Sequence, residues 1–257
     1  MVVLNNNYGF QSVKQLNFKG VATPPAPNYA NLAPLEKDTF VKSETIKKER
    51  RLTDGSLAVE EFDSKTGKKI KDTAYKKDGT IDCIGEFDIN TGNLIKMIGY
   101  EEDGKTISSI VEHDAKTGNR KKAIKFYKGG EKIESLETYD PTTGNQIKDT
   151  WFYDDGKTVR SIHEYDSSRV AFETKNIKFK KDGKTIDWID ENDPKTGSRV
   201  KTTFYYNDGK TIESIDECDA SNPHRVIKST LYDEDGKTIK RIIRFNPQTG
   251  EEIKTSE

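Results

Sequence analysis

The chain has 257 residues, of which 32% are hydrophobic and 34% are charged, and its mean hydropathy is -0.89. Globular domains contain about 45–50% apolar residues, so this composition excludes a single large, round core. The 43 basic residues nearly balance the 44 acidic ones and aromatic residues reach 9%, whereas disordered chains combine few aromatic residues with a high net charge. We therefore expect a thin, elongated fold. The net charge of -1 gives no general attraction to nucleic acid or to an anionic membrane.

Signals for export or membrane insertion are not apparent in the sequence. No stretch approaches the roughly 18 apolar residues of a membrane helix, and the opening MVVLNNNYGF lacks the basic start of a secretory signal. Cys83 and Cys218 lie about five repeats apart in the array described below. That is too far for a disulfide, whose Cα atoms are about 4.4–6.8 Å apart. Free thiols without a signal predict a cytoplasmic protein that contacts no membrane.

Residues 1–40 differ in composition from the rest of the chain. They open rich in asparagine, and the stretch from Val21 to Pro34 holds four prolines. We expect a flexible N-terminal segment over 1–40 and a repeat array over 41–257. The charged stretch from Phe40 to Leu52 is interpreted as a degenerate first strand that caps the array, with a short helix as the alternative.

Two series of glycines divide the array into repeats. The first series stands in Asp-Gly or an equivalent pair and comprises Gly55, Gly79, Gly104, Gly130, Gly156, Gly183, Gly209 and Gly236. The second stands in Thr-Gly and comprises Gly67, Gly92, Gly118, Gly144, Gly197 and Gly250. The two series interleave, which predicts about eight repeats of roughly 26 residues with two turns each.

Each repeat predicts two antiparallel strands. An aromatic residue stands four residues before the first glycine, as at Tyr100 and Phe152, and an aliphatic residue stands three after it, as at Ile107. Asp-Gly between such segments predicts a tight hairpin turn, because glycine accepts a positive φ. The second connection, as in Asp140–Gly144, predicts a longer loop. Because Gly or Pro recurs about every dozen residues, helices are excluded, and we expect an all-β fold of about sixteen strands.

Such strands can form a hairpin meander or a solenoid of stacked repeats. Aspartates recur at one repeat position (Asp63, Asp88, Asp114, Asp140, Asp166, Asp193 and Asp219) and lysines at another (Lys71, Lys96, Lys148, Lys201, Lys228 and Lys254). A solenoid would stack these like charges about 4.8 Å apart, which is costly. In a meander, equivalent positions lie two strands apart, roughly 10 Å, near the Debye length. We therefore expect an elongated antiparallel meander, as a single-layer or half-pipe sheet.

The hairpin around Gly156 gives a specific expectation for side-chain placement. A turn at Asp154–Lys157 places Phe152 opposite Val159 on one face of the sheet. The same count places Ile147 and Ile162 near each other on the other face. Each face is thus expected to carry a sparse apolar stripe.

The repeat resembles known repeat domains. The pattern Tyr-x-x-Asp-Gly-Lys-Thr-Ile, from Tyr100 to Ile107, and Asp-x-x-Thr-Gly, from Asp88 to Gly92, resemble short β-hairpin repeat domains of unknown function in bacterial hypothetical proteins. They are more loosely similar to MORN-type and tyrosine–aspartate repeat proteins, although the glycine and aromatic positions do not match the MORN motif closely. The resemblance covers about residues 50–254. It implies a fold, and it carries over no catalytic residue.

No catalytic or metal-binding signature stands out from the repeat. Asp154-Asp155-Gly156 and Asp233-Glu234-Asp235-Gly236 lack the further ligands of a calcium loop, and turn-forming acid is the favoured reading. The histidines are His113, His163 and His224, and none has a second His or Cys at metal-ligand spacing. We therefore expect no enzyme, no metal and no cofactor.

The repeat is broken at two turns, where the Thr-Gly pair is lost. These are Asp166–Arg169 and Asp219–His224, and Trp151 and Trp188 fall near the first. We expect Trp151, Trp188, Arg169 and His224 to mark a partner contact, with drift in a tolerant loop as the alternative.

The expected function follows from the uniformity of the repeats, which favours extended contact over chemistry at one point. We expect a non-enzymatic protein-interaction or scaffold protein, and the alternative is a structural or exported surface or effector repeat protein. The expected partner is a protein. Nucleic acid is disfavoured, because acids alternate with the lysines in almost every repeat.

Overall fold

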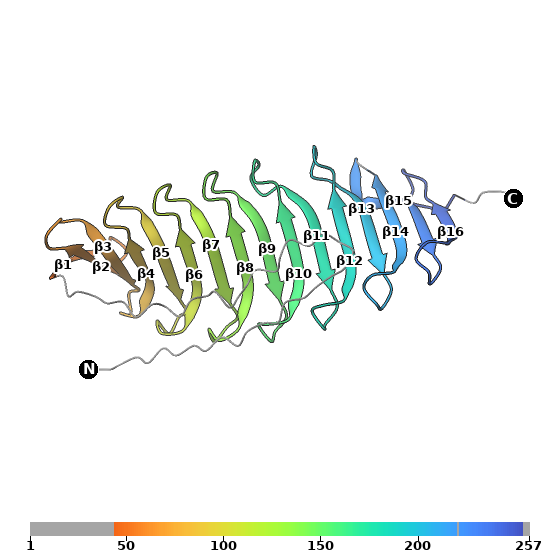
Figure 1. Cartoon of the computed structure of the whole chain (residues 1–257). Helices are drawn as coiled ribbons and strands as arrows, with labels where there is room; N and C mark the ends of the chain where they lie inside the picture. The colour runs from red at the N-terminus through yellow and green to blue at the C-terminus, as the bar shows by residue number, and fades with distance from the viewer. Residues whose placement is uncertain (1–43, 220, 254–257) are drawn as a thin grey trace. The chain divides into compact units, whose positions relative to one another are not determined.

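The protein is described by a computed structural model covering residues 44–219 and 221–253, so the predicted N-terminal segment 1–40 lies outside the described residues. The described residues form sixteen strands in one antiparallel sheet (Figure 1). The strands are β1 (Thr45–Arg51), β2 (Leu57–Asp63), β3 (Lys69–Tyr75), β4 (Ile81–Phe87), β5 (Leu94–Tyr100), β6 (Ile107–His113), β7 (Arg120–Phe126), β8 (Ile133–Tyr139), β9 (Gln146–Phe152), β10 (Val159–Tyr165), β11 (Glu173–Phe179), β12 (Ile186–Asn192), β13 (Arg199–Tyr205), β14 (Ile212–Asp219), β15 (Asn222–Tyr232) and β16 (Ile239–Arg244).

The strands lie in the sheet in sequence order, from β1 to β16. Nearly all contacts between strands join neighbours, so the sheet is a single layer, and it is open because β1 and β16 each have one neighbour. This confirms the predicted all-β meander of about 26-residue repeats. The first strand lies within the stretch expected to cap the array, and all of its residues are exposed. The described residues contain no helix, and hence no helical segment suited to crossing a membrane.

The Asp-Gly connection is longer than the tight turn expected from its sequence. Between β5 and β6, the Glu101 N–H donates to the Thr106 carbonyl at 2.8 Å, and the Gly104 N–H donates to the Glu101 carbonyl at 3.1 Å. The glycine therefore ends a four-residue turn inside a six-residue loop. The Asp103 carboxylate accepts the N–H groups of Lys105 and Thr106 at 2.9 and 2.8 Å, and the Thr106 hydroxyl at 2.6 Å. Asp-Gly-Lys-Thr is thus a turn in which the aspartate and the threonine hold the loop closed.

This carboxylate arrangement recurs along one edge of the sheet. The equivalent aspartates are Asp155, Asp182, Asp208 and Asp235. The threonine hydroxyl is the largest of several hydrogen bonds that lower the pKa of Asp103, Asp208 and Asp235 to about 2. Asp235 stands in a segment that resembles part of a calcium-binding loop. Its carboxylate instead accepts hydrogen bonds from Lys237 and Thr238 of its own turn.

The Thr-Gly loops along the other edge use a second aspartate in the same way. Between β6 and β7, the Gly118 N–H donates to the Asp114 carbonyl at 2.8 Å. The Asp114 carboxylate accepts the N–H groups of Lys116 and Thr117 at 3.0 and 2.9 Å. These hydrogen bonds within the loop therefore stabilise the ionised form of Asp114. This local satisfaction adds to strand separation as a reason why the aspartate series is tolerated.

The hairpin around Gly156 confirms one expected contact and corrects another. Phe152 lies opposite Val159, as expected. A bulge then adds one residue to β10, so that Ile162 lies opposite Thr150. Ile147 is three residues from Thr150 and therefore lies on the face opposite Ile162. The prediction that Ile147 and Ile162 lie near each other on one face is wrong. The bulge, which the turn count omitted, is the reason.

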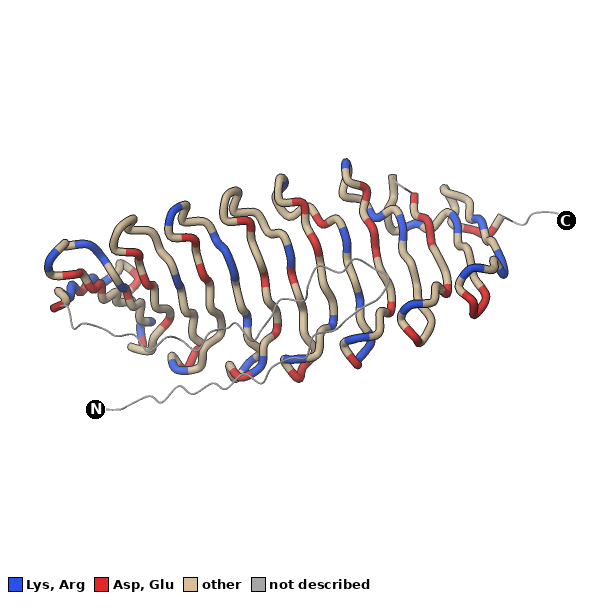
Figure 2. The backbone as a smooth tube through the Cα atoms, in the orientation of Figure 1, with Lys and Arg blue, Asp and Glu red and all other residues tan. Residues whose placement is uncertain are grey.

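One face of the sheet carries an aliphatic row flanked by charges, and we call it the aliphatic face. The row runs across the strands through Ile84, Ile98, Ile110, Ile124, Leu136, Thr150, Ile162, Ile177, Ile189, Thr203 and Ile215. Beside it, glutamates and lysines alternate from strand to strand through Glu61, Lys71, Glu86, Lys96, Glu112 and Lys122, and again from Lys148 through Glu164, Lys175, Glu191, Lys201 and Glu217 to Lys228. Figure 2 shows acidic and basic segments on neighbouring strands. Each lysine of this ladder thus lies opposite at least one glutamate, which stabilises the pairing.

Loops of successive repeats also touch. A Cβ added to Gly104 would lie 2.6 Å from the backbone nitrogen of Ile81, so this glycine permits a close approach between consecutive Asp-Gly loops. On the other edge, the Asn119 side-chain amide donates to the Pro141 and Thr142 carbonyls of the next Thr-Gly loop, both at 3.1 Å. The two edges thereby connect each repeat to the next.

Candidate functional site

The face opposite the aliphatic row changes character half-way along the array, and we call it the polar face. At one register position it carries Lys48, Glu60 and Asp72 on β1 to β3, and then Gly85, Met97, Val111 and Ala123 on β4 to β7. From β8 to β15 the same position carries Glu137, Asp149, His163, Asn176, Asp190, Thr202, Asp216 and Ser229, which we call the polar row. Side chains alternate between faces along each strand, so all of these residues lie on the polar face. The second half of the array thus carries a continuous polar strip, and the small or apolar residues of β4 to β7 separate it from the charged residues of β1 to β3.

Glu137 begins the polar row and is buried, whereas its partner Lys125 is exposed and Tyr139 is half-buried. Lys125 on β7 lies 2.8 Å from Glu137 Oε1, and the Tyr139 hydroxyl donates to Oε2. Burial acts to raise the pKa of Glu137, and the hydrogen bonds from Lys125 and Tyr139 outweigh it, so the pKa is lowered. Burial and the hydrogen bond to Glu137 raise the pKa of Tyr139 to about 12. This pair therefore stays as a carboxylate and a neutral phenol at neutral pH.

Asp149, the next residue of the row, is only partly satisfied. Its side chain is almost inaccessible, at 6% relative exposure for the residue. The Trp151 indole donates to Oδ2 at 2.6 Å, while Oδ1 is buried without a hydrogen-bond partner. Burial raises the pKa of Asp149 against the Trp151 hydrogen bond; the charge of Glu137 also raises it, while the charges of His163 and Lys125 lower it. An acceptor left unpaired in this way is costly.

His163 and Asp190 continue the row with better-satisfied contacts. His163 Nδ1 lies 2.9 Å from Glu173 Oε2, and its Nε2 lies 3.3 Å from the Ser161 hydroxyl. The Thr202 hydroxyl donates to Asp190 Oδ1 at 2.5 Å. Burial raises the pKa of Asp190, while the Thr202 hydrogen bond opposes the shift. Two aspartates of the row, Asp149 and Asp190, therefore hold a proton more readily than an exposed aspartate does.

A shallow groove of about 400 Å³ opens beside Asp190. It is lined by Glu173, Asp190, Asn192, Thr196, Gly197, Ser198, Arg199, Pro223 and His224. The second broken turn forms one of its walls. Here Cys218 pairs with Val226 and Asp219 pairs with Asn222, so residues 223–225 bulge out of β15. The Arg199 guanidinium donates to the Pro223 carbonyl at 3.0 Å and fastens this bulge to β13.

Trp151 and Trp188 share a second row on the polar face. Successive strand partners lead from Trp151 through Ser161 and Lys178 to Trp188. Both indoles are half-buried. The Arg160 guanidinium lies 5.4 Å from the centroid of the Trp151 ring, within cation–π range. The structure thus brings the two predicted tryptophans to one face, three strands apart, beside the polar row.

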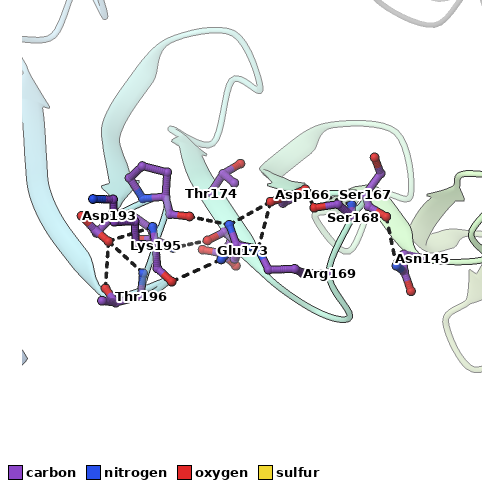
Figure 3. Close-up of polar contacts among 12 residues, drawn as sticks. Asn145, Asp166, Ser167, Ser168, Arg169, Glu173, Thr174, Asp193, Lys195 and Thr196 are labelled. Carbon is purple, nitrogen blue, oxygen red and sulfur yellow. Dashed lines mark hydrogen bonds and ion pairs between the residues drawn. The ribbon is translucent and has the colours of Figure 1, made fainter.

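Arg169 and His224 lie at the loop edge of the sheet, apart from the tryptophan row. Figure 3 shows Arg169 between the loop of Asp166 and the loop of Lys195. Its guanidinium donates to Asp166 Oδ2 at 2.8 Å and to the Lys195 carbonyl at 3.2 Å, and it stacks 3.3 Å from the Phe172 ring centroid. Arg169 thus takes the linking role that asparagines have in earlier loops. His224 is exposed on the rim of the groove.

The sequence reasoning missed the polar row, although a signal was present. Each member on an even-numbered strand stands two residues after the serine or tryptophan that precedes the core isoleucine or leucine. Examples are Ser135 to Glu137, Ser161 to His163 and Trp188 to Asp190. Aligning this position across the repeats would have revealed the change from an apolar residue at Val111 to polar residues from Glu137 onward. Predicting that the column forms a continuous row also requires the register across the bulges.

The polar row consists of hydrogen-bond acceptors and ion-paired side chains. Within residues 44–219 and 221–253, no group of three or more His, Cys, Asp or Glu side chains is placed to hold a metal ion. Cys83 and Cys218 are both free thiols, and burial raises the pKa of each. Most charged groups of the row are paired with neighbouring side chains.

Fold and site together define a β-hairpin repeat protein with one chemically distinct face. The chain belongs to the family described as "protein of unknown function (DUF2963)", whose model matches residues 53–98, 80–125, 126–176, 171–204, 179–228 and 205–257. This confirms a repeat domain of unknown function. No curated protein matches the chain.

Similarity to solved structures is distant. A TarM mutant of S. aureus is 14% identical over 44% of this chain, with a TM-score of 0.31. A glycosylation-associated protein complex from Streptococcus agalactiae is 14% identical over 46% of this chain and 18% of that chain, with a TM-score of 0.23. A porin-like protein from Bacteroides uniformis is 11% identical over 80% of this chain and 91% of that chain, with a TM-score of 0.22. The matched part spans 21% of the TarM chain.

Proposed function

We propose that this protein is a non-enzymatic interaction or scaffold module that binds another protein along the polar face of β8 to β14. The supporting observation is the continuous polar row that begins at Glu137, in which Asp149 Oδ1 and Asn176 Oδ1 are buried without hydrogen-bond partners. A sheet that needed only to be stable would gain nothing from unpaired acceptors. Partner binding would explain why they are kept.

The neighbouring tryptophans add to this proposal. Trp151 and Trp188 lie in the row beside the polar row, and tryptophan is enriched among residues that dominate binding energy. Two unpaired thiols, Cys83 and Cys218, are consistent with a reducing cytoplasm as the place of action.

Photo-crosslinking in cells tests the proposed face. A photoreactive amino acid at Lys178 lies on the polar face, and one at Lys175 lies in the same strand on the aliphatic face. We expect the Lys178 position to give discrete crosslinked species in mass spectrometry and the Lys175 position to give few. Equal crosslinking from both positions, or none from Lys178, contradicts the proposal.

A further inference from the structure

We propose that Arg160 and Lys178 on the polar face bind a carboxylate, so that the partner presents a glutamate or aspartate side chain to strands β9 to β12. This inference rests on the proposed function, because it names the chemistry of the protein that the polar face would bind. We call Arg160 and Lys178 the cation pair. Their position in the repeat, their lack of counter-ions and the tryptophans around them support the proposal.

Arg160 occupies a repeat position at which acids predominate. The bulge that follows each Asp-Gly loop from β4 onward adds one residue to the even-numbered strand. On the other strands this residue is Asp82, Ser108, Glu134, Asp187, Glu213 and, on the edge strand β16, Lys240. On β10 it is Arg160, and its guanidinium lies 5.4 Å from the centroid of the Trp151 ring on the polar face. Because a bulge re-aims a side chain, this one directs a cation to a place where most repeats have an acid or a hydroxyl.

Lys178 brings a second cation beside the first. It pairs with Ser161, the residue that follows Arg160, and its Nζ lies 5.9 Å from the centroid of the Tyr153 ring. Burial and the charge of Arg160 lower the pKa of Lys178, while the charge of Asp187 acts in the opposite direction without outweighing them. The two cations therefore lie close enough to repel each other.

The cation pair has no counter-ion within the part of the chain that the structure describes. No carboxylate of residues 44–219 and 221–253 lies within ion-pair distance of Arg160 or Lys178. Lys125, which precedes them in the same row of the polar face, is by contrast paired with Glu137. Asp187 lies outside ion-pair distance and balances only one of the two positive charges. A carboxylate from a partner would remove this remaining repulsion.

Two tryptophans frame the cation pair. Successive strand partners lead from Trp151 on β9 to Lys178 on β11 and Trp188 on β12, so both cations lie between the two indoles. All four side chains are half-buried, which leaves part of each open to solvent. Rings that shield a carboxylate from water strengthen its pairing with a guanidinium. The arrangement therefore suits a carboxylate that approaches from solvent and lies against the indoles.

An acidic side chain fits this place better than a nucleic acid does. One guanidinium and one ammonium match one carboxylate, and the planar fork of arginine can hold both carboxylate oxygens. A nucleic acid needs a positively charged groove that follows its backbone. The equivalent bulge residues on β8 and β12, Glu134 and Asp187, are acidic and would repel further phosphates. The cation pair is thus an isolated site for one anionic group.

Peptide binding to the full-length chain tests this inference. The probes are a labelled peptide of alternating glutamate and glycine, the same peptide with glutamine or with arginine in place of glutamate, and a labelled single-stranded oligothymidylate. We expect the glutamate peptide to bind, as measured by fluorescence anisotropy, and the other two peptides not to bind. Equal binding of the glutamate and glutamine peptides, or tighter binding of the oligothymidylate than of the glutamate peptide, overturns the inference.

Intrinsic fluorescence locates the bound peptide. The chain contains two tryptophans, Trp151 and Trp188, and both lie beside the cation pair. We expect the tryptophan emission of the wild type to change during the titration with the same midpoint as the anisotropy. Saturation of the anisotropy without any change in emission would place the peptide elsewhere on the chain and reject the site.

Matched variants separate the cation pair from general charge. Arg160→Glu introduces the residue type that stands at this position on β8 and β14, and we expect it to weaken glutamate-peptide binding about tenfold or more. Lys175→Gln removes one positive charge from the aliphatic face of β11 and should change binding less than about twofold. Circular dichroism establishes that both variants are folded. Equal binding by the wild type and by folded Arg160→Glu refutes the role of Arg160.

The crosslinking experiment separates this inference from the proposed function. A photoreactive amino acid at Lys178 leaves Arg160 and both tryptophans in place, so it still reports contact with the polar face. Discrete crosslinks from the Lys178 position, combined with failure of the glutamate peptide to bind, would leave the proposed function standing and reject the carboxylate.

Discussion

The aspartates of this sheet titrate in two opposite senses because they lie in two kinds of surroundings. Loop aspartates such as Asp103 accept backbone N–H groups and a threonine hydroxyl in solvent, and these bonds favour the ionised form. Asp149 and Asp190 lie on the polar face under neighbouring side chains, and burial favours their protonated form. The same residue type thus stabilises the fold as an anion at the edges and resists ionisation on the face.

Acid should destabilise the sheet through the loop aspartates. The pKa of Asp103, Asp208 and Asp235 is about 2 in the folded chain, below the ordinary value of 3.8. Their contribution is therefore fully present above about pH 4 and is lost as the pH falls toward 2. We expect the melting temperature, followed by circular dichroism, to fall over this range, and to fall less when the three aspartates are replaced by asparagine. A melting temperature that stays constant down to pH 2 would contradict this account.

The buried aspartate of the polar row should show the opposite sign. Because the folded-state pKa of Asp149 is raised, protonation stabilises the folded chain as the pH falls through that pKa. The Asp149→Asn variant cannot gain this stabilisation. The wild type minus variant difference in melting temperature should therefore increase from pH 7 to pH 4. A difference that is independent of pH would show that Asp149 titrates normally.

At the scale of strands and loops, the sequence predicted the strands better than the register across the hairpin connections. Alternating aromatic and aliphatic positions with glycines between them were sufficient for sixteen strands, because these are local properties. The bulge after Val159 was not predictable from the turn count, since it depends on how the six-residue loop closes. It reverses the face on which Ile147 lies relative to Ile162. The polar row depends on these bulges in every repeat, so no single repeat shows it.

Substitution of Gly104 in an Asp-Gly loop should cost more stability than substitution of Gly92 in a Thr-Gly loop. Gly104 and Gly92 both have positive φ, of 64° and 79°. Alanine in this region costs about 1–2 kcal/mol from backbone strain alone. A Cβ at Gly104 would also clash with the Ile81 nitrogen at 2.6 Å, whereas a Cβ at Gly92 has nothing within 4 Å. Gly104→Ala should therefore lower the free energy of unfolding, measured in urea, by clearly more than Gly92→Ala. Equal losses would show that the edge relaxes around the added carbon.

Arg169 should act in stability and not in partner binding. Its guanidinium links the Asp166 loop to the Lys195 carbonyl and stacks on Phe172. Removing hydrogen bonds made by a charged group costs about 1.5–3 kcal/mol, so Arg169→Ala should lower the unfolding free energy by an amount in this range. Crosslinking from the Lys178 position in the folded variant should be unchanged. Loss of binding with unchanged stability would instead support the partner contact predicted from the sequence.

At the scale of the whole sheet, stability comes from neighbours alone. The strands pair only in sequence order, and no described layer covers either face. Such quasi-one-dimensional arrays are stabilised by the sum of nearest-neighbour interfaces. The largely buried hydrophobic side chains, among them Ala123, Leu136 and Ile189, lie in the middle of the array. By contrast β1 is exposed throughout, and Ile239 and Ile242 on β16 are about half exposed. Order should therefore be greatest in the central strands.

A single core truncation should divide this array in two. Leu136 is 9% exposed and lies between Ile124 on β7 and Thr150 on β9. Leucine to alanine in such a site costs about 2–5 kcal/mol, and here the loss falls on two strand interfaces only. Hydrogen exchange of Leu136→Ala should show lost protection in β7 to β9, with protection in β3 and β4 on one side and β12 and β13 on the other largely retained. A uniform loss of protection across all strands would contradict this prediction. It would mean that the loop contacts on both edges, such as those of Gly104 and Asn119, couple the repeats more strongly than the local cost of the cavity.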